Sequence, residues 1–323
     1  MRSPSILIAA CLLALALPSG ASASYSVGIS ENEPSMFGSP LFQSLGVKYA
    51  RVVAAYDVAL HPGNFDYERV AAYVAAADAQ GIQPLVALEH VRGDASRCSS
   101  RRNFRKKVCR LPSKARYTRA VRAFVKAFPT VKTLAPWNEA NHFTQPTSRN
   151  PKRAAQFTNV AARLCKHCKI IVADILDQAD NPRAKRPTYR ATQRYISKFR
   201  RALKVKRKIC GIHNYSDVNR FRTSGTAALM RALGCRQYWL TETGGLYRFG
   251  SFWTKRTRKG CRSSKSCQLK ATKFLFKKVR RYKRVKRVYV YTWFPGTNAR
   301  FDAGLTWPNG TARPALKEVQ KHI

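Results

Sequence analysis

Short apolar runs alternate along the chain with longer segments in which apolar residues recur every three or four positions. The runs predict β-strands, and the segments predict helices with one buried face. The predicted strands lie at 26–29, 49–54, 83–88, 131–137, 170–173, 209–213, 238–241 and 288–293. The predicted helices lie at 67–80, 115–128, 154–165, 189–203, 226–233, 269–282 and 312–322. This alternation is typical of an α/β protein with a parallel sheet covered by helices.

The number of strand–helix units predicts the architecture. Eight units between residues 24 and 323 fit a (β/α)8 TIM barrel, whose active sites lie at the carboxyl ends of the strands. No stretch rich in Pro, Gly or Ser interrupts these units, so we expect a single domain over 24–323. A doubly wound open sheet is the alternative fold, and it would hold the ends of distant strands farther apart.

The first residues have the pattern of an export signal. Arg2 precedes an apolar stretch at 6–17, and the small residues Ala21, Ser22 and Ala23 follow it. We expect residues 1–23 to be a secretory signal peptide and the mature protein to be secreted. The apolar stretch is shorter than the roughly 20 residues of a membrane-spanning helix, and no later stretch approaches that length.

The cysteines agree with an extracellular location. Eight remain after the predicted signal peptide, and an even number in an exported chain favours disulfides. We expect neighbours in sequence to pair: Cys98 with Cys109, Cys261 with Cys267, Cys165 with Cys168, and Cys210 with Cys235. The last four also fit exchanged pairs. The Cys165 to Cys168 stretch resembles half of a zinc site as well, but no second half occurs at suitable spacing.

The chain is strongly basic. It has 61 Lys and Arg against 16 Asp and Glu, which gives a formal net charge of +45. Such an excess favours association with polyanions, although a solvated helical exterior explains it as well. Basic loops follow the third and seventh predicted strands, at the end where a barrel has its active site. The sequence shows no helix-turn-helix, zinc module or RNA-binding pattern, so we expect no specific nucleic-acid partner.

Two glutamates are notable for where they occur. Glu139 follows the fourth predicted strand, and Glu242 ends the seventh. A carboxylate at the tip of a buried strand is costly unless that tip opens into a site. In a closed barrel both tips point into the same mouth. The pattern therefore indicates that the two glutamates share an active site.

A pair of carboxyl groups in one pocket suits the cleavage of a glycosidic bond. One carboxyl protonates the leaving oxygen, and the other attacks the sugar or activates water. Their environments must differ, because burial or a neighbouring charge keeps one protonated while hydrogen-bond donors keep the other ionised. The chemistry needs no metal or cofactor, since the carboxyl pair supplies both the proton and the nucleophile.

Several short motifs, in their order and spacing, resemble those of the clan A glycoside hydrolases, which are retaining (β/α)8 enzymes. The resemblance spans nearly the whole mature chain and departs from the clan at Ala140, where a proline is frequent, and at Val53, where some relatives have a histidine. The motifs are Leu45 to Arg51 at strand two, Trp137-Asn138-Glu139 after strand four, His213-Asn214-Tyr215 after strand six, Thr241-Glu242 at strand seven and Tyr291-Thr292-Trp293 at strand eight.

The resemblance implies a role for each of these residues. Glu139 would be the acid/base and Glu242 the nucleophile. The substrate-binding set would comprise Asn138 at the sugar hydroxyl beside the reacting carbon, Arg51 and Tyr215 as donors to Glu242, His213 in the pocket lining and Trp293 as the floor under the sugar ring. Glu89, His90 and Asp174, which follow the third and fifth strands, are further candidates for substrate contact. Arg51 also fits a different role, the neutralisation of a buried acid such as Asp57.

The sequence thus predicts an exported retaining O-glycosyl hydrolase that acts on a carbohydrate, for which the basic rim favours an anionic one. The alternative is a non-catalytic barrel that binds anionic cell-wall polymer or polysaccharide through the same rim. Binding that collapses at high salt and survives the loss of both glutamates would favour this alternative.

Overall fold

The computed structural model describes residues 25–93, 98, 106–254, 257, 259–297 and 300–323. The predicted signal peptide at 1–23 lies outside these residues, as does most of the basic segment between Cys98 and Lys106. Within the described part of the chain, no helix has the length and apolarity that crossing a membrane requires.

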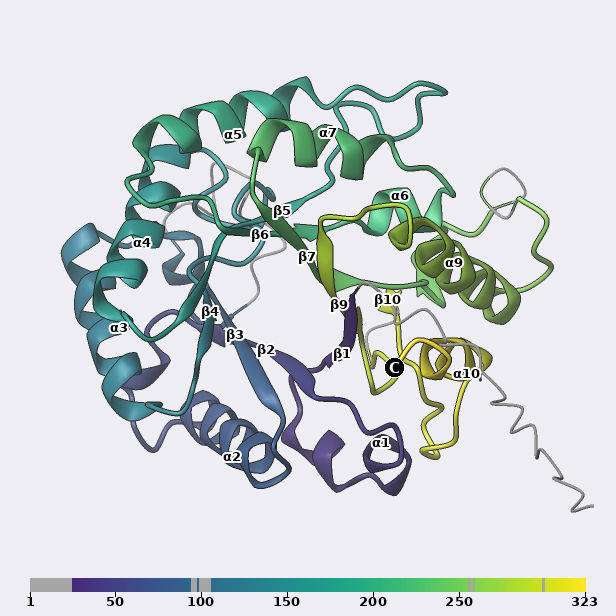
Figure 1. Cartoon of the computed structure of the whole chain (residues 1–323), viewed down its shortest axis with the longest axis horizontal. Helices are drawn as coiled ribbons and strands as arrows, with labels where there is room; N and C mark the ends of the chain where they lie inside the picture. Colours follow the sequence, from purple (N-terminus) through teal and green to yellow (C-terminus); the bar gives the residue numbers. More distant parts are fainter. Residues whose placement is uncertain (1–24, 94–97, 99–105, 255–256, 258, 298–299) are drawn as a thin grey trace, which may run out of the picture.

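Eight parallel strands close into a barrel at the centre of the molecule (Figure 1). Each pairs with the next barrel strand along the chain, and the first closes the ring against the last. This closure confirms the TIM barrel over the open sheet, because the outer strands of an open sheet do not pair. The barrel strands are β1 (Ser26–Ser30), β2 (Tyr49–Ala55), β3 (Gln83–Glu89), β4 (Thr133–Ala135), β5 (Lys169–Leu176), β6 (Ile209–His213), β7 (Gln237–Thr243) and β9 (Val285–Tyr291).

A ring of helices surrounds the barrel, as the apolar periodicity predicts (Figure 1). Four of them begin after an Asn or Ser whose side chain accepts a hydrogen bond from the first turn, namely Asn64, Ser113, Asn150 and Ser263. The ring comprises α2 (Phe65–Ala79), α3 (Lys114–Ala127), α4 (Pro151–Leu164), α5 (Arg190–Ala202), α7 (Ser224–Leu233), α9 (Ser264–Val279) and α10 (Pro314–Gln320). Shorter pieces are α1 (Pro40–Gln43), α6 (Tyr215–Asn219), and the 3₁₀ turns η1 (Pro34–Gly38), η2 (Val58–Leu60) and η4 (Lys107–Cys109).

The apolar core has two parts. The larger part fills the space between the strands and the helices, where residues such as Val70, Phe124 and Leu229 are fully buried. The smaller part fills the inside of the barrel. It consists of Val53, Leu85, Ala87, Ala135, Ile171, Trp239 and Tyr289. A polar group containing Arg51, Asp174 and His213 is also fully buried, so the barrel encloses charges that must be paired.

Four disulfides join the eight cysteines in the pairs predicted from neighbouring positions. Cys210–Cys235 ties the start of β6 to the residue shortly before β7, and the other three close shorter loops. The sulfurs of Cys165 and Cys168 are bonded to each other, so they do not present the thiolates that the zinc interpretation requires. Cross-links of this kind stabilise the fold mainly by restricting the unfolded chain.

A small second sheet, which the apolar pattern does not reveal, lies outside the barrel. Its strands β8 (Arg248–Phe249) and β10 (Phe301–Asp302) are two residues long and antiparallel. Asp302 is buried and forms a two-bond pair with Arg313 at 3.0 and 2.9 Å, which anchors this sheet at the start of α10. The sheet joins the loops after β7 and β9 and places Phe249 beside Phe301.

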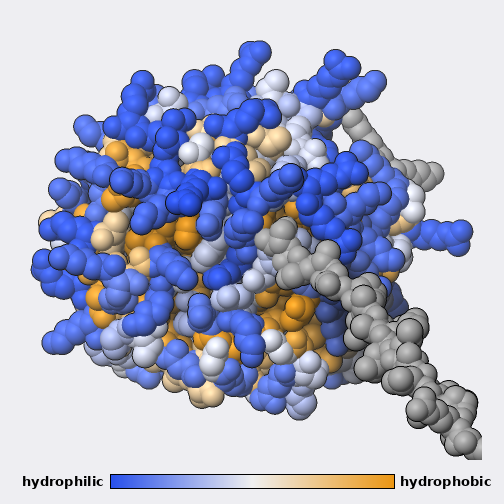
Figure 2. All heavy atoms as spheres, viewed as in Figure 1, coloured by the Kyte–Doolittle hydropathy of each residue, from blue (hydrophilic) through white to orange (hydrophobic). Residues whose placement is uncertain are grey.

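Hydrophilic side chains cover most of the molecular face in Figure 2, and apolar ones show between them in small areas. This agrees with a composition in which Lys and Arg number 61 of the 323 residues. The hydrophilic face in this view agrees with a solvated helical exterior.

Candidate active site

Glu139 and Glu242 face the same cavity, as the strand-end argument predicts. Both line a cavity of about 640 Å³, and their side chains are 18% and 14% exposed. One carboxylate oxygen of each, together with a ring nitrogen of His213, lie within 4.8 Å of one another. Glu139 comes just after β4, and Glu242 lies near the end of β7. The barrel has therefore brought together two acids from opposite parts of the chain.

The backbone at Glu139 has an uncommon conformation. Its φ of 43° lies in the left-handed region, which costs a residue with a side chain roughly 1 kcal/mol or more. Hydrogen bonds on either side hold it there: the Asn138 N–H donates to the Leu88 carbonyl at 2.6 Å, and the Ala140 N–H donates to the Asp174 carbonyl at 3.0 Å. Neighbouring strands thus impose the conformation that aims the Glu139 side chain into the cavity.

Glu242 accepts hydrogen bonds on both of its carboxylate oxygens. Arg51, which is fully buried on β2, donates from Nη1 to Oε2 at 2.6 Å. The Tyr215 hydroxyl donates to Oε1 at 3.0 Å. Burial and the Glu242 charge raise the pKa of Tyr215 well above its ordinary value, so this hydroxyl keeps its proton. Two donors therefore fix the orientation of the Glu242 carboxylate.

Arg51 also holds the asparagine that precedes Glu139. Its Nη2 donates to Asn138 Oδ1 at 2.7 Å, and the same nitrogen lies 3.5 Å from the Asp174 carboxylate. Although burial alone would lower the pKa of Arg51, the charges of Glu242 and Asp174 raise it. One buried guanidinium therefore links the strand-two, strand-four and strand-seven parts of the site. Asp57 is not its partner; that carboxylate pairs with Arg116 at 3.2 Å.

His213 connects the buried carboxylate of Asp174 to the carboxylate of Glu139. His213 Nε2 lies 3.2 Å from Asp174, and His213 Nδ1 lies 3.1 Å from Glu139 Oε1. Burial opposes a charge on His213, but Asp174 and Glu242 raise its pKa to about 10. At neutral pH the ring is therefore an imidazolium that donates to both carboxylates. Gly211 makes room for this arrangement, because a Cβ at that position would overlap the Asp174 carboxylate and lie 2.6 Å from Thr241 Oγ1.

The imidazolium affects both acids that it contacts. Burial alone would raise the pKa of Glu139, but the hydrogen bond and charge of His213, with His142 nearby, lower it below its ordinary value. Burial also acts to raise the pKa of Asp174, and His213 and Arg51 more than offset it. His142 Nδ1 lies 3.5 Å from Glu139 Oε2. Glu139 is therefore flanked by two histidines, whereas Glu242 is held by an arginine and a tyrosine.

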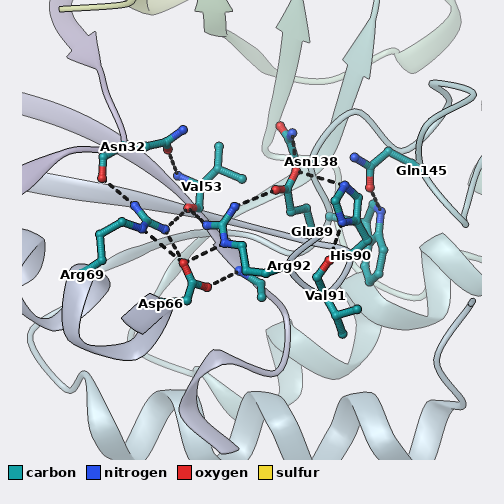
Figure 3. Close-up of polar contacts among 12 residues, drawn as sticks. Asn32, Val53, Asp66, Arg69, Glu89, His90, Val91, Arg92, Asn138 and Gln145 are labelled. Carbon is teal, nitrogen blue, oxygen red and sulfur yellow. Dashed lines mark hydrogen bonds and ion pairs between the residues drawn. The ribbon is translucent and has the colours of Figure 1, made fainter. Parts of the chain in front are cut away.

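Asn138 is held from a second side by a polar network (Figure 3). Its Nδ2 lies 3.4 Å from the carboxylate of Glu89, at the end of β3. Glu89 in turn pairs with Arg92 at 3.2 Å. Arg92 pairs with Asp66 at 2.7 Å, and Asp66 also binds Arg69. Glu89 thus connects the Asn138 amide to a charged cluster at the start of α2.

Seven of the eight predicted substrate-binding residues lie outside the cavity lining. Arg51, His213 and Asp174 are fully buried beneath the glutamates, so they contact other protein groups. Glu89 contacts Asn138, while the His90 Nδ1 lies 2.7 Å from the Val91 carbonyl. Asn138 itself is buried beside Glu139. Of the set, Tyr215 lines the cavity directly.

Trp293 does not form the floor that the resemblance implies. Its side chain is 1% exposed and packs edge-on against Phe42, with 5.4 Å between ring centroids. Tyr291, two residues earlier and the last residue of β9, lines the cavity instead. Its hydroxyl keeps its proton, because burial and the charge of Glu242 raise its pKa. The assignment of the floor to Trp293 is therefore wrong.

The outer wall of the cavity is aromatic and comes from loops that sequence reasoning passed over. Leu246, Phe249 and Phe252 follow β7, and Phe301 belongs to β10. Flat apolar faces of this kind suit the carbon–hydrogen faces of a sugar ring. These residues have no helix or strand periodicity, and the only signal in the sequence was the proximity of the loop to Glu242.

Glu139, His213 and Glu242 also have the donor types of a metal site. The protonation state of His213 argues against this use, since an imidazolium with a pKa of about 10 has no lone pair for a metal. Both of its nitrogens face carboxylates. The trio fits a proton-bearing network better than a metal centre.

Comparison with solved structures places the whole chain among enzymes of one fold. A xylanase from Paenibacillus barcinonensis superposes with a TM-score of 0.64 at 12% identity, over 93% of this chain and 96% of that one. A family 1 β-glucosidase from Thermotoga maritima superposes with a TM-score of 0.59 at 12% identity, over 93% and 96%. A psychrophilic glycoside hydrolase family 10 endo-β-1,4-xylanase gives 0.62 at 13% identity, over 92% and 96%.

The chain shares its (β/α)8 fold with these glycoside hydrolases. Neighbours from several of their families score similarly, so the structure favours none of them over the others. No protein-family model matches the chain, and no curated protein matches it in sequence. At identities of 11 to 14% the likeness establishes a shared fold, and the activity must be argued from the site.

Proposed function

We propose that the protein is an exported retaining glycoside hydrolase that cleaves an oligosaccharide or polysaccharide by double displacement. The observation that carries the proposal is the approach of the Glu139 and Glu242 carboxylate oxygens to within 4.8 Å inside one open cavity. Retaining glycosidases keep their two carboxyl groups about 5–5.5 Å apart, and inverting enzymes keep them about 6.5–9.5 Å apart to admit a water molecule.

Glu242 is the nucleophile in this proposal. Its oxygen forms a bond to the anomeric carbon as the glycosidic oxygen leaves with a proton from Glu139. Arg51 and Tyr215 support this role, because their hydrogen bonds to both carboxylate oxygens restrict the rotation of Glu242. A water molecule then attacks the same carbon, gives its proton to Glu139 and releases Glu242. The sugar keeps its configuration after the two inversions.

Glu139 must be protonated in the first step and ionised in the second. In the free protein the His213 imidazolium favours the ionised form. A bound sugar excludes water from the partly exposed Glu139 carboxylate, and this loss of solvation raises its pKa in the direction that the first step needs. Once the bond to Glu242 has formed, the negative charge beside Glu139 disappears and its pKa falls, which suits the base of the second step.

Chemical rescue tests the two assignments separately. We expect Glu242→Ala to lose turnover of activated aryl glycosides, and added azide to restore it with formation of the inverted glycosyl azide. We expect Glu139→Ala to keep activity on substrates with good leaving groups and, with azide, to give the retained glycosyl azide. Glu68→Ala, which removes an exposed glutamate on α2, is the matched control and should leave turnover unchanged.

Several results would contradict the proposal. Unchanged activity of Glu242→Ala would remove the nucleophile assignment. An inverted product from the unaltered protein would contradict retention. If a broad panel of glycosides is not hydrolysed and polysaccharide binding survives the loss of both glutamates, the non-catalytic alternative would take its place.

A further inference from the structure

A second cavity adjoins the one that contains the glutamates. It measures about 840 Å³. The two cavities share part of their walls, formed by Pro182, Arg220, Phe249 and Phe252. A ligand chain that lies over the glutamates can therefore continue into the second cavity without leaving the protein surface.

The two cavities differ in charge. The lining of the first includes four carboxyl groups, those of Glu139, Asp177, Asp180 and Glu242, although burial and the neighbouring Asp217 raise the pKa of Asp177 well above its ordinary value. The second has no Asp or Glu among its described lining residues. It is lined instead by five cationic side chains, so we refer to it as the basic cavity. They are Arg183, Lys185, Arg220, Arg222 and Lys259.

Arg220 lies at the boundary between the two cavities, and its surroundings favour the binding of an anion. It is half-buried, and its guanidinium lies 4.8 Å from the centroid of the Phe252 ring. Burial and the neighbouring charges of Arg222 and Arg183 lower the pKa of Arg220. An anion bound here would relieve this repulsion. Asp177 acts in the opposite direction on Arg220, and Asp217 lies 3.4 Å from Arg222.

The setting of these cations differs from that of the general basic surface. Side chains such as Lys204 and Lys206 are exposed on the loop before β6, at the opposite end of the barrel from the glutamates. The cations of the basic cavity instead surround a hollow next to the glutamates, together with the aromatic rings of Phe249 and Phe252. Cations with aromatic faces suit a ligand made of sugar rings that bear anionic groups.

We propose that the basic cavity binds the anionic groups of an acidic polysaccharide whose scissile bond lies between Glu139 and Glu242. The proposal rests on the glycosidase function above and names its class of substrate. Carboxylate and sulfate groups share the chemistry that guanidinium and ammonium groups recognise. The repelling carboxyls of the first cavity keep such groups away from the reacting bond, and the basic cavity attracts them to one side of it.

The test compares acidic and neutral polysaccharides on charge-matched variants. The first variant is Arg183→Gln with Lys185→Gln, two exposed positions. The second is Arg220→Gln, with its melting temperature measured to verify folding. The control is Lys204→Gln with Lys206→Gln, which removes the same charge at the far end of the barrel. The probes are a polyuronate, a sulfated glycan and neutral xylan.

Two quantities are measured. One is the ratio of kcat/KM on the acidic probe to kcat/KM on the neutral probe. The other is the Kd of each probe in the Glu242→Gln background, where the substrate is not consumed. We expect both variants at the basic cavity to lower the kcat/KM ratio and weaken acidic-probe binding about tenfold, and the control to change neither. The difference should shrink at high salt. Comparing polyuronate with sulfated glycan distinguishes the two anionic groups.

The outcomes separate this inference from the proposed function. Hydrolysis of neutral probes with no preference for acidic ones would overturn the inference and leave the glycosidase intact. Equal losses in the control would also overturn it, because they would indicate a general effect of net charge. If no probe is hydrolysed but the basic-cavity variants alone weaken acidic-probe binding, the cavity assignment stands and the glycosidase proposal fails.

Discussion

The two glutamates occupy the same cavity but have different partners. Glu242 accepts from Arg51 and Tyr215, one at each of its carboxylate oxygens. Glu139 accepts from the His213 imidazolium and lies 3.5 Å from His142, a second histidine in the cavity lining. A carboxylate held at both oxygens suits a nucleophile that must keep its orientation, and one that faces the cavity beside histidines suits a group that exchanges a proton. The surroundings therefore give two chemically identical side chains different roles.

The largest expected effect comes from removing Arg51. Arg51→Met takes the donor from Glu242 and leaves Asp174 with its His213 contact but without its buried guanidinium. We expect kcat to fall about 10³-fold, and the free energy of unfolding to fall by about 3–5 kcal/mol. Aryl-glycoside kinetics and urea unfolding measure the two effects.

Arg287→Met is the matched control for that variant. Arg287 is another buried arginine, whose guanidinium lies 3.4 Å from the centroid of the Tyr49 ring and outside the cavity lining. It should destabilise the fold without changing kcat of the folded protein. An equal loss of kcat in both variants would mean that Arg51 acts through stability alone.

Replacing His213 should have the second largest effect on catalysis. We expect His213→Asn to lower kcat on the order of 10²-fold. Its positive charge favours the ionised form of Glu139, so its removal raises the pKa of Glu139. The alkaline limb of the pH profile of kcat/KM, which reports the acid, should then move to higher pH. His61→Asn, at a half-exposed histidine, should leave the profile unchanged. Movement of the alkaline limb to lower pH would contradict the charge argument.

Tyr215→Phe should have a smaller effect. It removes one hydrogen bond to the Glu242 carboxylate, so kcat should fall about tenfold. The alkaline limb of the pH profile of kcat/KM should stay in place. Tyr67→Phe on α2 provides the control. A shift of the alkaline limb would indicate that Tyr215 acts on Glu139.

The smallest expected effect is on stability against pH. The pKa of His213 is about 10 in the folded protein and 6.5 in its ordinary range. Its contribution is thus fully present below pH 6.5 and is lost as the pH rises through about 10. We expect the melting temperature to decline by several degrees over this window. His213→Asn should flatten the decline, and an equally steep decline in that variant would assign it to other groups.

Much of the fold and of the carboxylate pair could be predicted from the sequence, because each barrel strand is a short apolar run and parallel topology collects the strand ends at one mouth. The errors arose where a strand end was misplaced. Asp174 was expected after the fifth strand, but β5 extends to Leu176, so Asp174 lies inside the barrel. The apolar run to Trp293 outlasts β9, which ends at Tyr291.

Other parts of the site have no local signature at all. The aromatic wall depends on β8 pairing with β10, two segments of two residues each that meet across some 50 residues of sequence. The contacts of His213 depend on which charges surround it in space. A strand-end histidine in the sequence is compatible with a pocket wall or a buried bridge, and only the positions of Asp174 and Glu139 decide between them.

Gly211 illustrates how a residue without chemistry can govern a reaction. Even a methyl group at this position would displace the Asp174 carboxylate, and with it the counter-charge that keeps the imidazole ring protonated. The side chains at positions 174 and 211 therefore constrain each other: a residue larger than glycine at 211 would require a smaller side chain at 174. The protonation of His213 beside the catalytic carboxylates thus depends on the absence of a side chain at Gly211 on the neighbouring strand. A list of reactive side chains alone would not include this residue.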